Sequence, residues 1–166
     1  MTSFQNIPEE FQRLDWLILR NGWISLYWKT EVLEKDLEWF KKENYAIAQF
    51  DCTTWISEKE MHKQLKMRFN FPDYYGENFD ALNDCLSYID IINTGLIVTF
   101  RHLDNCNFKL IHTLLDVFAD NARRQMLYGK RLIILIQVSN RKFQIDNVGA
   151  NHVILNHTEW LESTKL

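Results

Sequence analysis

Residues that break or cross-link a chain are scarce in this sequence of 166 residues, which has five glycines, two prolines and three cysteines. It contains no internal repeat and no low-complexity linker, so we expect a folded chain. Cys52, Cys85 and Cys106 are odd in number and lack CxxC spacing. We expect buried free thiols in a reducing compartment, and hence a cytoplasmic location.

Signals for membranes, metals and catalysis are also lacking. No apolar run is long enough to cross a membrane, and no charged-then-apolar leader opens the chain. There is no GxGxxG, Walker or GxSxG motif, and the five histidines fit neither HExxH nor a zinc-finger spacing. We therefore expect no membrane contact, no cofactor, no metal and no enzymatic activity.

Positive charge is missing from one long segment, because residues 69–100 contain no Lys, Arg or His. The same segment carries five acids: Asp73, Glu77, Asp80, Asp84 and Asp90. Tyr74 and Tyr75 lie among them. A run of one sign with aromatic residues predicts a surface that binds a positively charged partner.

Helical spacing gathers three of these acids on one side. Glu77, Asp80 and Asp84 fall opposite an apolar stripe. The stripe comprises Phe79, Leu82, Cys85, Leu86 and Ile89. Repulsion between Asp80 and Asp84, one turn apart, costs about 0.2–0.5 kcal/mol in an isolated helix. The face is either a merely solvated acidic surface or one kept acidic for binding, and spacing alone leaves both interpretations open.

The residues before this helix predict a short loop. Pro72 prevents the preceding residues from continuing a helix, and Gly76 permits a turn that a side chain would resist. The loop holds Tyr74 and Tyr75 beside these carboxylates, and we expect one of them to pack inward. Tyrosines next to carboxylates are typical of protein-recognition surfaces.

Catalysis and metal binding by these carboxylates are less consistent with the sequence. The paired acids of glycosidases lie in a cleft on separate elements, whereas Asp80 and Asp84 share one helix face. The acids of this segment lack EF-hand spacing, and no histidine accompanies them. Binding of a partner remains the interpretation that uses both the acids and the tyrosines.

A basic segment follows the acidic one. Residues 101–142 hold eight Lys and Arg against three acids. Basic and aromatic residues do not alternate there as a base-stacking platform requires. We interpret Arg123 and Arg124 as cations near a helix C-terminus, and Lys130 and Arg131 as the start of a strand. No direct contact with nucleic acid is expected.

Alternating strands and helices are predicted along the chain. Strands are expected at 45–50, 95–100, 131–138 and, weakly, 152–155. Helices are expected over 30–44, 57–68, the acidic segment, from 108 to a stop near 129, and around 159–163. Asn21-Gly22, between DWLILR and WISLYWK, predicts a β-hairpin. Apolar strands between helices favour an α/β fold with a parallel sheet.

The fifteen residues PDYYGENFDALNDCL, from Pro72 to Leu86, closely resemble the signature of the barstar family of ribonuclease inhibitors. The resemblance implies a barstar-like domain over 45–138, with about three parallel core strands flanked by helices. Residues 1–44 and 139–166 are then extensions. Residues 1–44 hold four of the six tryptophans, so we expect the hairpin and helix there to pack on the core.

The same resemblance implies the binding residues. Asp80 and Asp84 match two central aspartates that pair with cations of the nuclease active site, and Asp84 is expected to contribute most. Tyr74 matches a tyrosine that packs against the nuclease. Asn78 and Phe79 match flanking contacts.

Three features depart from the family pattern. Asp120, aligned through Val117 and Phe118, stands where the family has a glutamate. Asn83 replaces a tryptophan, and the loop SYIDIINTG is longer and lacks a Gly-Trp pair.

The resemblance implies a monomer that blocks the active site of a cationic ribonuclease or nuclease toxin. The departures leave open an immunity or adaptor protein for a basic partner that is not a nuclease.

Overall fold

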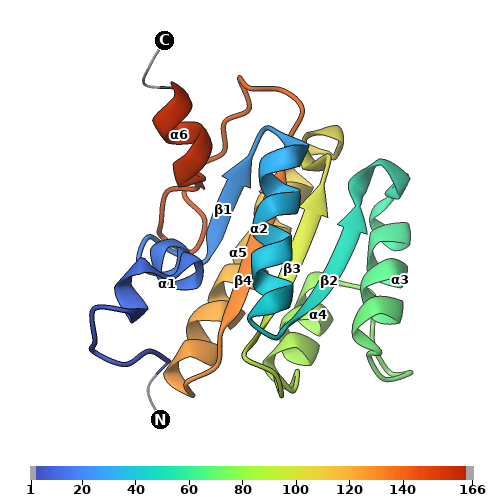
Figure 1. The fold of residues 1–166 in the computed structure, drawn as a ribbon. Helices are drawn as coiled ribbons and strands as arrows, with labels where there is room; N and C mark the ends of the chain where they lie inside the picture. Colours follow the sequence, from blue (N-terminus) through green and yellow to red (C-terminus); the bar gives the residue numbers. More distant parts are fainter. Residues whose placement is uncertain (1–2, 164–166) are drawn as a thin grey trace.

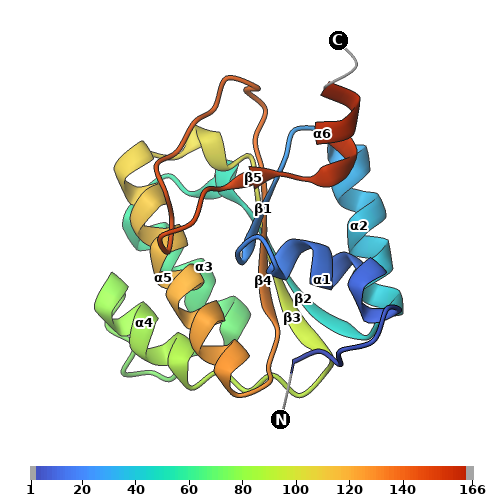
Figure 2. The same cartoon turned by 90° about the vertical axis from the view of Figure 1, so that its left-hand side faces the viewer.

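The computed structural model describes residues 3–163, apart from the side chain of Phe108. Within this part of the chain, five parallel strands form one sheet in the order β2-β3-β4-β1-β5 (Figure 1; β5 is labelled in Figure 2). They are β1 (Ile24–Tyr27), β2 (Tyr45–Asp51), β3 (Gly95–Arg101), β4 (Leu132–Gln137) and β5 (Ile154–Leu155). The three predicted core strands are confirmed, and β1 and β5 enlarge the sheet beyond the expected three.

Helices cover both faces of this sheet. α1 (Leu14–Leu19), α2 (Thr30–Lys42) and α6 (His157–Ser163) lie on one side. α3 (Glu58–Phe69), α4 (Phe79–Ser87) and α5 (Phe108–Leu127) lie on the other (Figure 2). Short 3₁₀ turns occupy η1 (Glu10–Gln12), η2 (Cys52–Thr54) and η3 (Leu103–Asn105). The predicted α/β class is confirmed.

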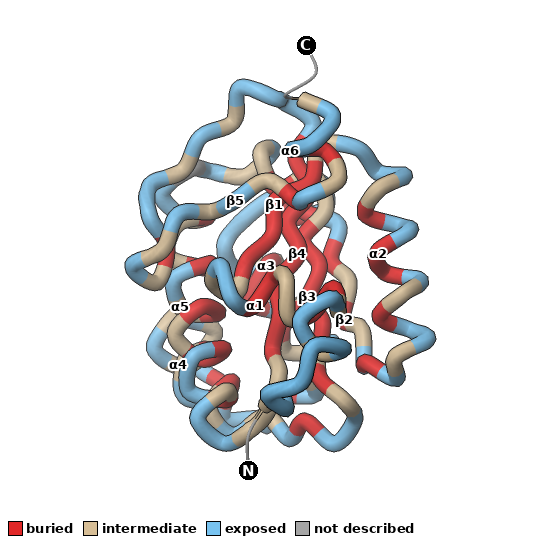
Figure 3. The backbone as a smooth tube through the Cα atoms, turned by 60° about the vertical axis from the view of Figure 1, so that its left-hand side comes forward, coloured by how far each residue is buried: buried red, intermediate tan, exposed pale blue. Residues whose placement is uncertain are grey.

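The sheet separates two apolar cores, and its central strands are buried along most of their length (Figure 3). All six residues of β4 are buried, as expected for a continuous apolar run covered on both sides. Leu82 and Leu86 of α4 lie in the larger core with Phe100 and Phe118. The apolar stripe predicted for α4 therefore points inward at these two positions.

The β-hairpin predicted around Asn21-Gly22 is wrong. The residues before it form α1, and β1 pairs in parallel with β4 and β5. Leu14 and Ile18 are buried one helical turn apart, so this short apolar run fits helical spacing as well as strand spacing. All four residues of β1 are buried, which suits an internal parallel strand better than a hairpin edge.

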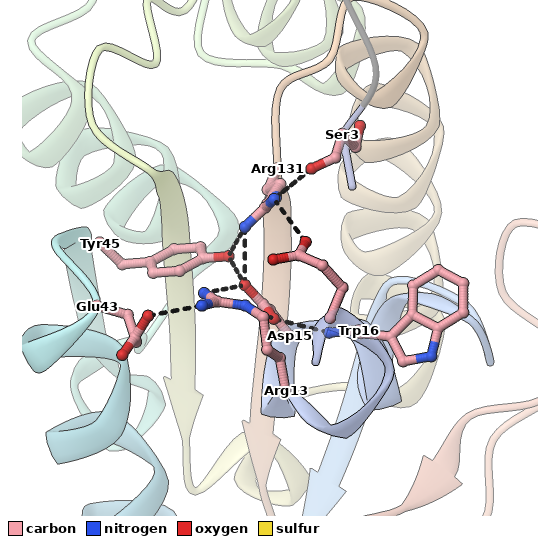
Figure 4. A network of polar contacts seen from close by, with 8 residues as sticks. Ser3, Arg13, Asp15, Trp16, Glu43, Tyr45 and Arg131 are labelled. Carbon is pink, nitrogen blue, oxygen red and sulfur yellow. Dashed lines mark hydrogen bonds and ion pairs between the residues drawn. The ribbon is translucent and has the colours of Figure 1, made fainter. Parts of the chain in front are cut away.

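A buried ion cluster ties α1 to the sheet (Figure 4). The Asp15 carboxylate is fully buried and accepts hydrogen bonds from Arg13 at 3.0 and 3.1 Å and from Arg131 at 2.9 Å. The Tyr45 hydroxyl donates to the same carboxylate at 2.5 Å. Burial and this carboxylate raise the pKa of Tyr45. Because Tyr45 opens β2 and Arg131 precedes β4, the cluster holds α1 against the start of both strands.

The C-terminal residues cover the sheet beside β1. β5 and α6 confirm the strand and the helix predicted near residues 152–155 and 159–163. Glu159 of α6 is buried and accepts hydrogen bonds from Trp28 N–H at 2.9 Å and Lys29 N–H at 2.8 Å. These backbone groups lie at the N-terminus of α2, where the helix dipole favours a carboxylate.

Candidate functional site

The acidic segment forms the predicted loop and helix. The Tyr75 N–H donates to the Pro72 carbonyl at 2.9 Å and closes a turn. The left-handed residue of the loop is Glu77, with a φ of 50°, rather than Gly76. Glycine is favoured at position 76 by space instead, since a Cβ there would lie 3.1 Å from the Asn78 amide nitrogen. That amide donates to the Gly76 carbonyl.

Tyr75 is the tyrosine that packs inward. Its side chain is buried, and its hydroxyl lies 2.6 Å from His62 Nδ1. The His62 ring also packs edge-on against Phe79, the first residue of α4. Burial lowers the pKa of His62 and raises the pKa of Tyr75. A neutral histidine on α3 therefore supports both the loop and the start of α4 from behind.

Tyr74, Asp80 and Asp84 lie on the outside of the same segment. Tyr74 is 85% exposed, and both aspartates are exposed. Neither aspartate carboxylate forms a hydrogen bond or ion pair with any residue that the structure describes. The surface made by these three residues, called the acidic face below, is therefore free to accept bonds from another molecule.

A surface hollow of about 540 Å³ adjoins the acidic face. Its lining includes Tyr74, Asp84, Tyr88 and Asp90. Two tyrosine rings and two carboxylates around one hollow suit the aliphatic stem and charged end of a lysine or arginine.

Tyr88 also belongs to this surface, although it is not among the predicted contact residues. Its side chain is 88% exposed. It follows Asp84 by four positions, as Asp84 follows Asp80, so helical spacing was the signal that could have identified it. Its ring and that of Tyr74 line the same hollow, so together they add exposed aromatic area beside Asp84.

Three other predicted contact residues also have structural roles. Asn78 caps α4, since its side-chain oxygen accepts a hydrogen bond from Ala81 N–H at 2.8 Å. Phe79 is half-buried against His62. Asn83 is half-buried and accepts a hydrogen bond from the Asn121 side chain at 2.9 Å, which fixes α4 against α5.

Asp120 is the predicted contact residue on α5. Its carboxylate pairs with Arg123 at 2.5 Å and with Arg124 at 2.9 Å. A cation of a partner would have to compete with these two arginines. The i,i+3 and i,i+4 spacings of the pairs are visible in the sequence, and we expect Asp120 to contribute less than Asp84.

The described residues contain no group of three or more His, Cys, Asp or Glu that could hold a metal ion. The same residues include no helix long and apolar enough to span a membrane. Asp80 and Asp84 are exposed on one helix face, and the hollow that Asp84 lines does not include Asp80, whereas the two acids of a glycosidase face each other across one cleft.

Comparison with known proteins finds a matching family model and other chains that are similar to parts of this one. The family model described as Barstar (barnase inhibitor) matches residues 45–137. The Bacillus subtilis (strain 168) protein named "Putative ribonuclease inhibitor YrdF" is 39% identical over 62 residues, which cover 37% of this chain and 59% of that protein. A chain in "Structure of Drosophila ORC bound to AT-rich DNA and Cdc6" matches with a TM-score of 0.49 and 16% identity, over 75% of this chain and 43% of that chain.

Proposed function

The chain belongs to the barstar family, and from that premise we propose that it inhibits a ribonuclease by covering the active site with its acidic face. The observation that carries this proposal is the pair Asp80 and Asp84, whose exposed carboxylates have no bonding partner among the described residues. The inhibitor would act as a monomer in the cytoplasm. Free cysteines in the described chain are compatible with that compartment.

The chemistry of a ribonuclease explains why carboxylates would suit it. The enzyme holds the phosphates of RNA with cationic side chains, which also attract carboxylates. Asp80 and Asp84 lie one helical turn apart and can each accept charge-assisted hydrogen bonds from such cations. The inhibitor offers no phosphodiester bond to cleave, so it would occupy the site without reacting.

Charge over a wider area supports the same proposal. Residues 69–100 carry five acids and no base. A field of one sign around the acidic face would steer a cationic enzyme toward it before contact. Cations of the partner lose their water when the complex forms. Removing the carboxylate that pairs with such a cation should therefore weaken the affinity of the complex strongly.

Other side chains would complete the contact. Tyr74 and Tyr88 would pack on the stem of a partner lysine or arginine whose charge meets Asp84 or Asp90 in the hollow between them. The wider proposed contact surface comprises Tyr74, Asn78, Phe79, Asp80, Asn83, Asp84 and Asp120, together with Tyr88.

The test is inhibition of RNA hydrolysis by barnase, which serves as the probe because the family is described as its inhibitor. The wild-type protein should suppress hydrolysis in a dose-dependent way, and Asp84→Ala should need a concentration higher by on the order of 100-fold, a magnitude taken from charged interface pairs in general, barnase–barstar among them. Glu38→Ala, an exposed acid on α2, is the matched control and should inhibit as the wild type does. Equal inhibition by all three proteins, or none by the wild type, would overturn the proposal.

A second candidate is a protein that binds a basic partner other than a nuclease. Asn83 favours it, because this residue stands where the family has a tryptophan and its side chain is bonded to Asn121. The acidic face then offers less apolar area than the family pattern implies. Such a protein would bind its partner through Asp84 without reducing RNA hydrolysis.

A further inference from the structure

Two cysteines far apart in the sequence meet at one end of the sheet. Cys52 begins η2 directly after β2, and Cys106 directly follows η3, which comes after β3. β2 and β3 are neighbours whose last residues, Asp51 and Arg101, lie in register. The Cys106 Sγ lies 3.8 Å from the Cys52 carbonyl oxygen, and the two thiol groups are also in hydrogen-bond contact with each other.

The two thiols have unlike surroundings. Cys52 is only 2% exposed, and burial raises the pKa of its thiol. Cys106 is half-exposed, and a hydrogen bond from Cys52 lowers the pKa of its thiol. The thiolate is the reactive form of cysteine, so Cys106 is the better nucleophile and Cys52 the protected neighbour.

Small molecules can reach Cys106 from solvent. The residue lines a surface hollow of about 690 Å³ with Trp55, Phe79 and Asn107 among its walls. Cys52 does not line this hollow. A reagent entering there would meet Cys106 first, while Cys52 lies behind it within reach of the same sulfur.

We propose that Cys106 and Cys52 form a thiol pair that is oxidised by a small disulfide of the glutathione type. The Cys106 thiolate attacks one sulfur of the disulfide, forms a mixed disulfide and releases one glutathione thiolate. The Cys52 thiol then gives its proton to the departing glutathione sulfur as it attacks the Cys106 sulfur, which forms the protein disulfide and releases the second glutathione. Two protein thiols are oxidised, one glutathione disulfide is reduced to two thiols, and the two protons pass to the released thiolates.

The consequence for the fold is a covalent link between the ends of β2 and β3. Phe79, the first residue of α4, shares the hollow with Cys106, so the link would form beside the start of α4. The oxidation chemistry itself does not depend on the proposed inhibition of a ribonuclease, because it needs only the free chain and the disulfide.

The experiment incubates the full-length protein with oxidised glutathione and maps its cysteines by peptide mass spectrometry after blocking free thiols. The expected product has lost the mass of two hydrogen atoms, contains a Cys52–Cys106 disulfide, and keeps Cys85 as its one blockable thiol. Cys85 is the internal control: it is also half-exposed, but burial raises the pKa of its thiol.

Variants separate the two steps. Cys85→Ser should form the disulfide at the wild-type rate. Cys52→Ser should stop at the mixed disulfide, with one glutathione retained on Cys106. Three blockable thiols in the wild type after oxidation, or a disulfide or stable adduct at Cys85 in place of the Cys52–Cys106 link, would overturn the proposal.

Discussion

Within α4, the apolar residues are buried or half-buried and the acidic residues are exposed to solvent. Leu82 and Leu86 are fully buried, whereas Asp80 and Asp84 on the opposite side of the same helix are exposed. An acid on the exposed side contributes nothing to packing and repels its neighbour one turn away. Stability and binding should therefore respond to different substitutions within α4.

The first prediction concerns stability alone. Asp84→Ala should leave the melting temperature unchanged or slightly raised, because it removes a repulsion of about 0.2–0.5 kcal/mol and introduces a good helix former. Leu82→Ala, two residues away on the buried side, should destabilise the protein by about 2–5 kcal/mol. Thermal unfolding of both variants checks this. A loss in Asp84→Ala as large as that in Leu82→Ala would show that Asp84 has a structural role.

The second prediction concerns pH. Burial lowers the pKa of His62 in the folded protein, against a smaller opposing effect of Glu58, so the unfolded chain binds a proton more readily. Stability contributed by neutral His62 is complete above about pH 6.5 and falls as the pH decreases toward the lower pKa of the folded state. Urea unfolding across this range should show a shallower pH dependence for His62→Gln than for the wild type.

The control for that experiment is His152→Gln, which replaces an exposed histidine. It should keep the wild-type pH dependence of the free energy of unfolding. Identical pH dependences for His62→Gln and the wild type would mean that His62 is not the cause of the change in the free energy of unfolding with pH.

Residue-level features were predictable where they follow from helical spacing. The period of 3.6 residues separates Leu82 from Asp84 without further information. The bond between Asn83 and Asn121 was not predictable, because it joins residues 38 positions apart and depends on how α4 packs on α5. The sequence predicted that one tyrosine packs inward. It could not predict that His62 is the partner of Tyr75, because that contact depends on how α3 packs against the loop.

Among the elements, α1 is held in place by a buried cluster of polar contacts. Its Asp15 carboxylate bonds to Arg13, Arg131 and Tyr45 while fully buried. Removing one member of such a cluster leaves buried charge without compensation, which costs more than an intact buried pair contributes. The cluster therefore makes α1 an integral part of the sheet layer.

The third prediction is a substitution in this cluster. Asp15→Asn should lower the free energy of unfolding by about 3–5 kcal/mol, because two arginines lose their shared carboxylate. Glu38→Gln removes the acid of an exposed pair with Lys41 and should cost at most about 1 kcal/mol. Urea unfolding measures both. A cost for Asp15→Asn no greater than that for Glu38→Gln would mean that solvent screens the cluster.

Elements with long periodic patterns were predicted well, and the short N-terminal ones were not. α2, α3 and α5 carry apolar residues over several turns, and a buried strand such as β4 is continuously apolar. α1 and β1 span six and four residues, too few to separate helix from strand by period. The Asn21-Gly22 pair that indicated a hairpin instead follows the end of α1.

At the scale of the whole molecule, the sheet is wider than the family match. Residues 45–137 supply β2, β3 and β4, while β1 lies between β4 and β5 and comes from outside that span. Local sequence could not reveal this order, because strand order is set by the pairing of distant segments. Without residues 1–44, the second core would lose its α1 and α2 side chains.

The fourth prediction follows from that order. A fragment of residues 45–138 should fail to unfold cooperatively and should bind a hydrophobic dye, because it exposes Ile133 and Leu135 of the second core. Circular dichroism melts and dye fluorescence, compared with the full chain, measure this. A cooperative transition at the melting temperature of the full chain would show that residues 45–138 fold independently and that the residues on either side do not stabilise them.

The association rate with barnase across a salt series tests directly whether the acidic face binds a cationic ribonuclease. We expect the wild-type rate to fall as salt rises, because screening weakens steering between exposed charges. We also expect a large loss of affinity for Asp84→Ala and a much smaller one for Asn83→Ala. A rate independent of salt, or equal effects of the two substitutions, would mean that the acidic face is only a solvated surface.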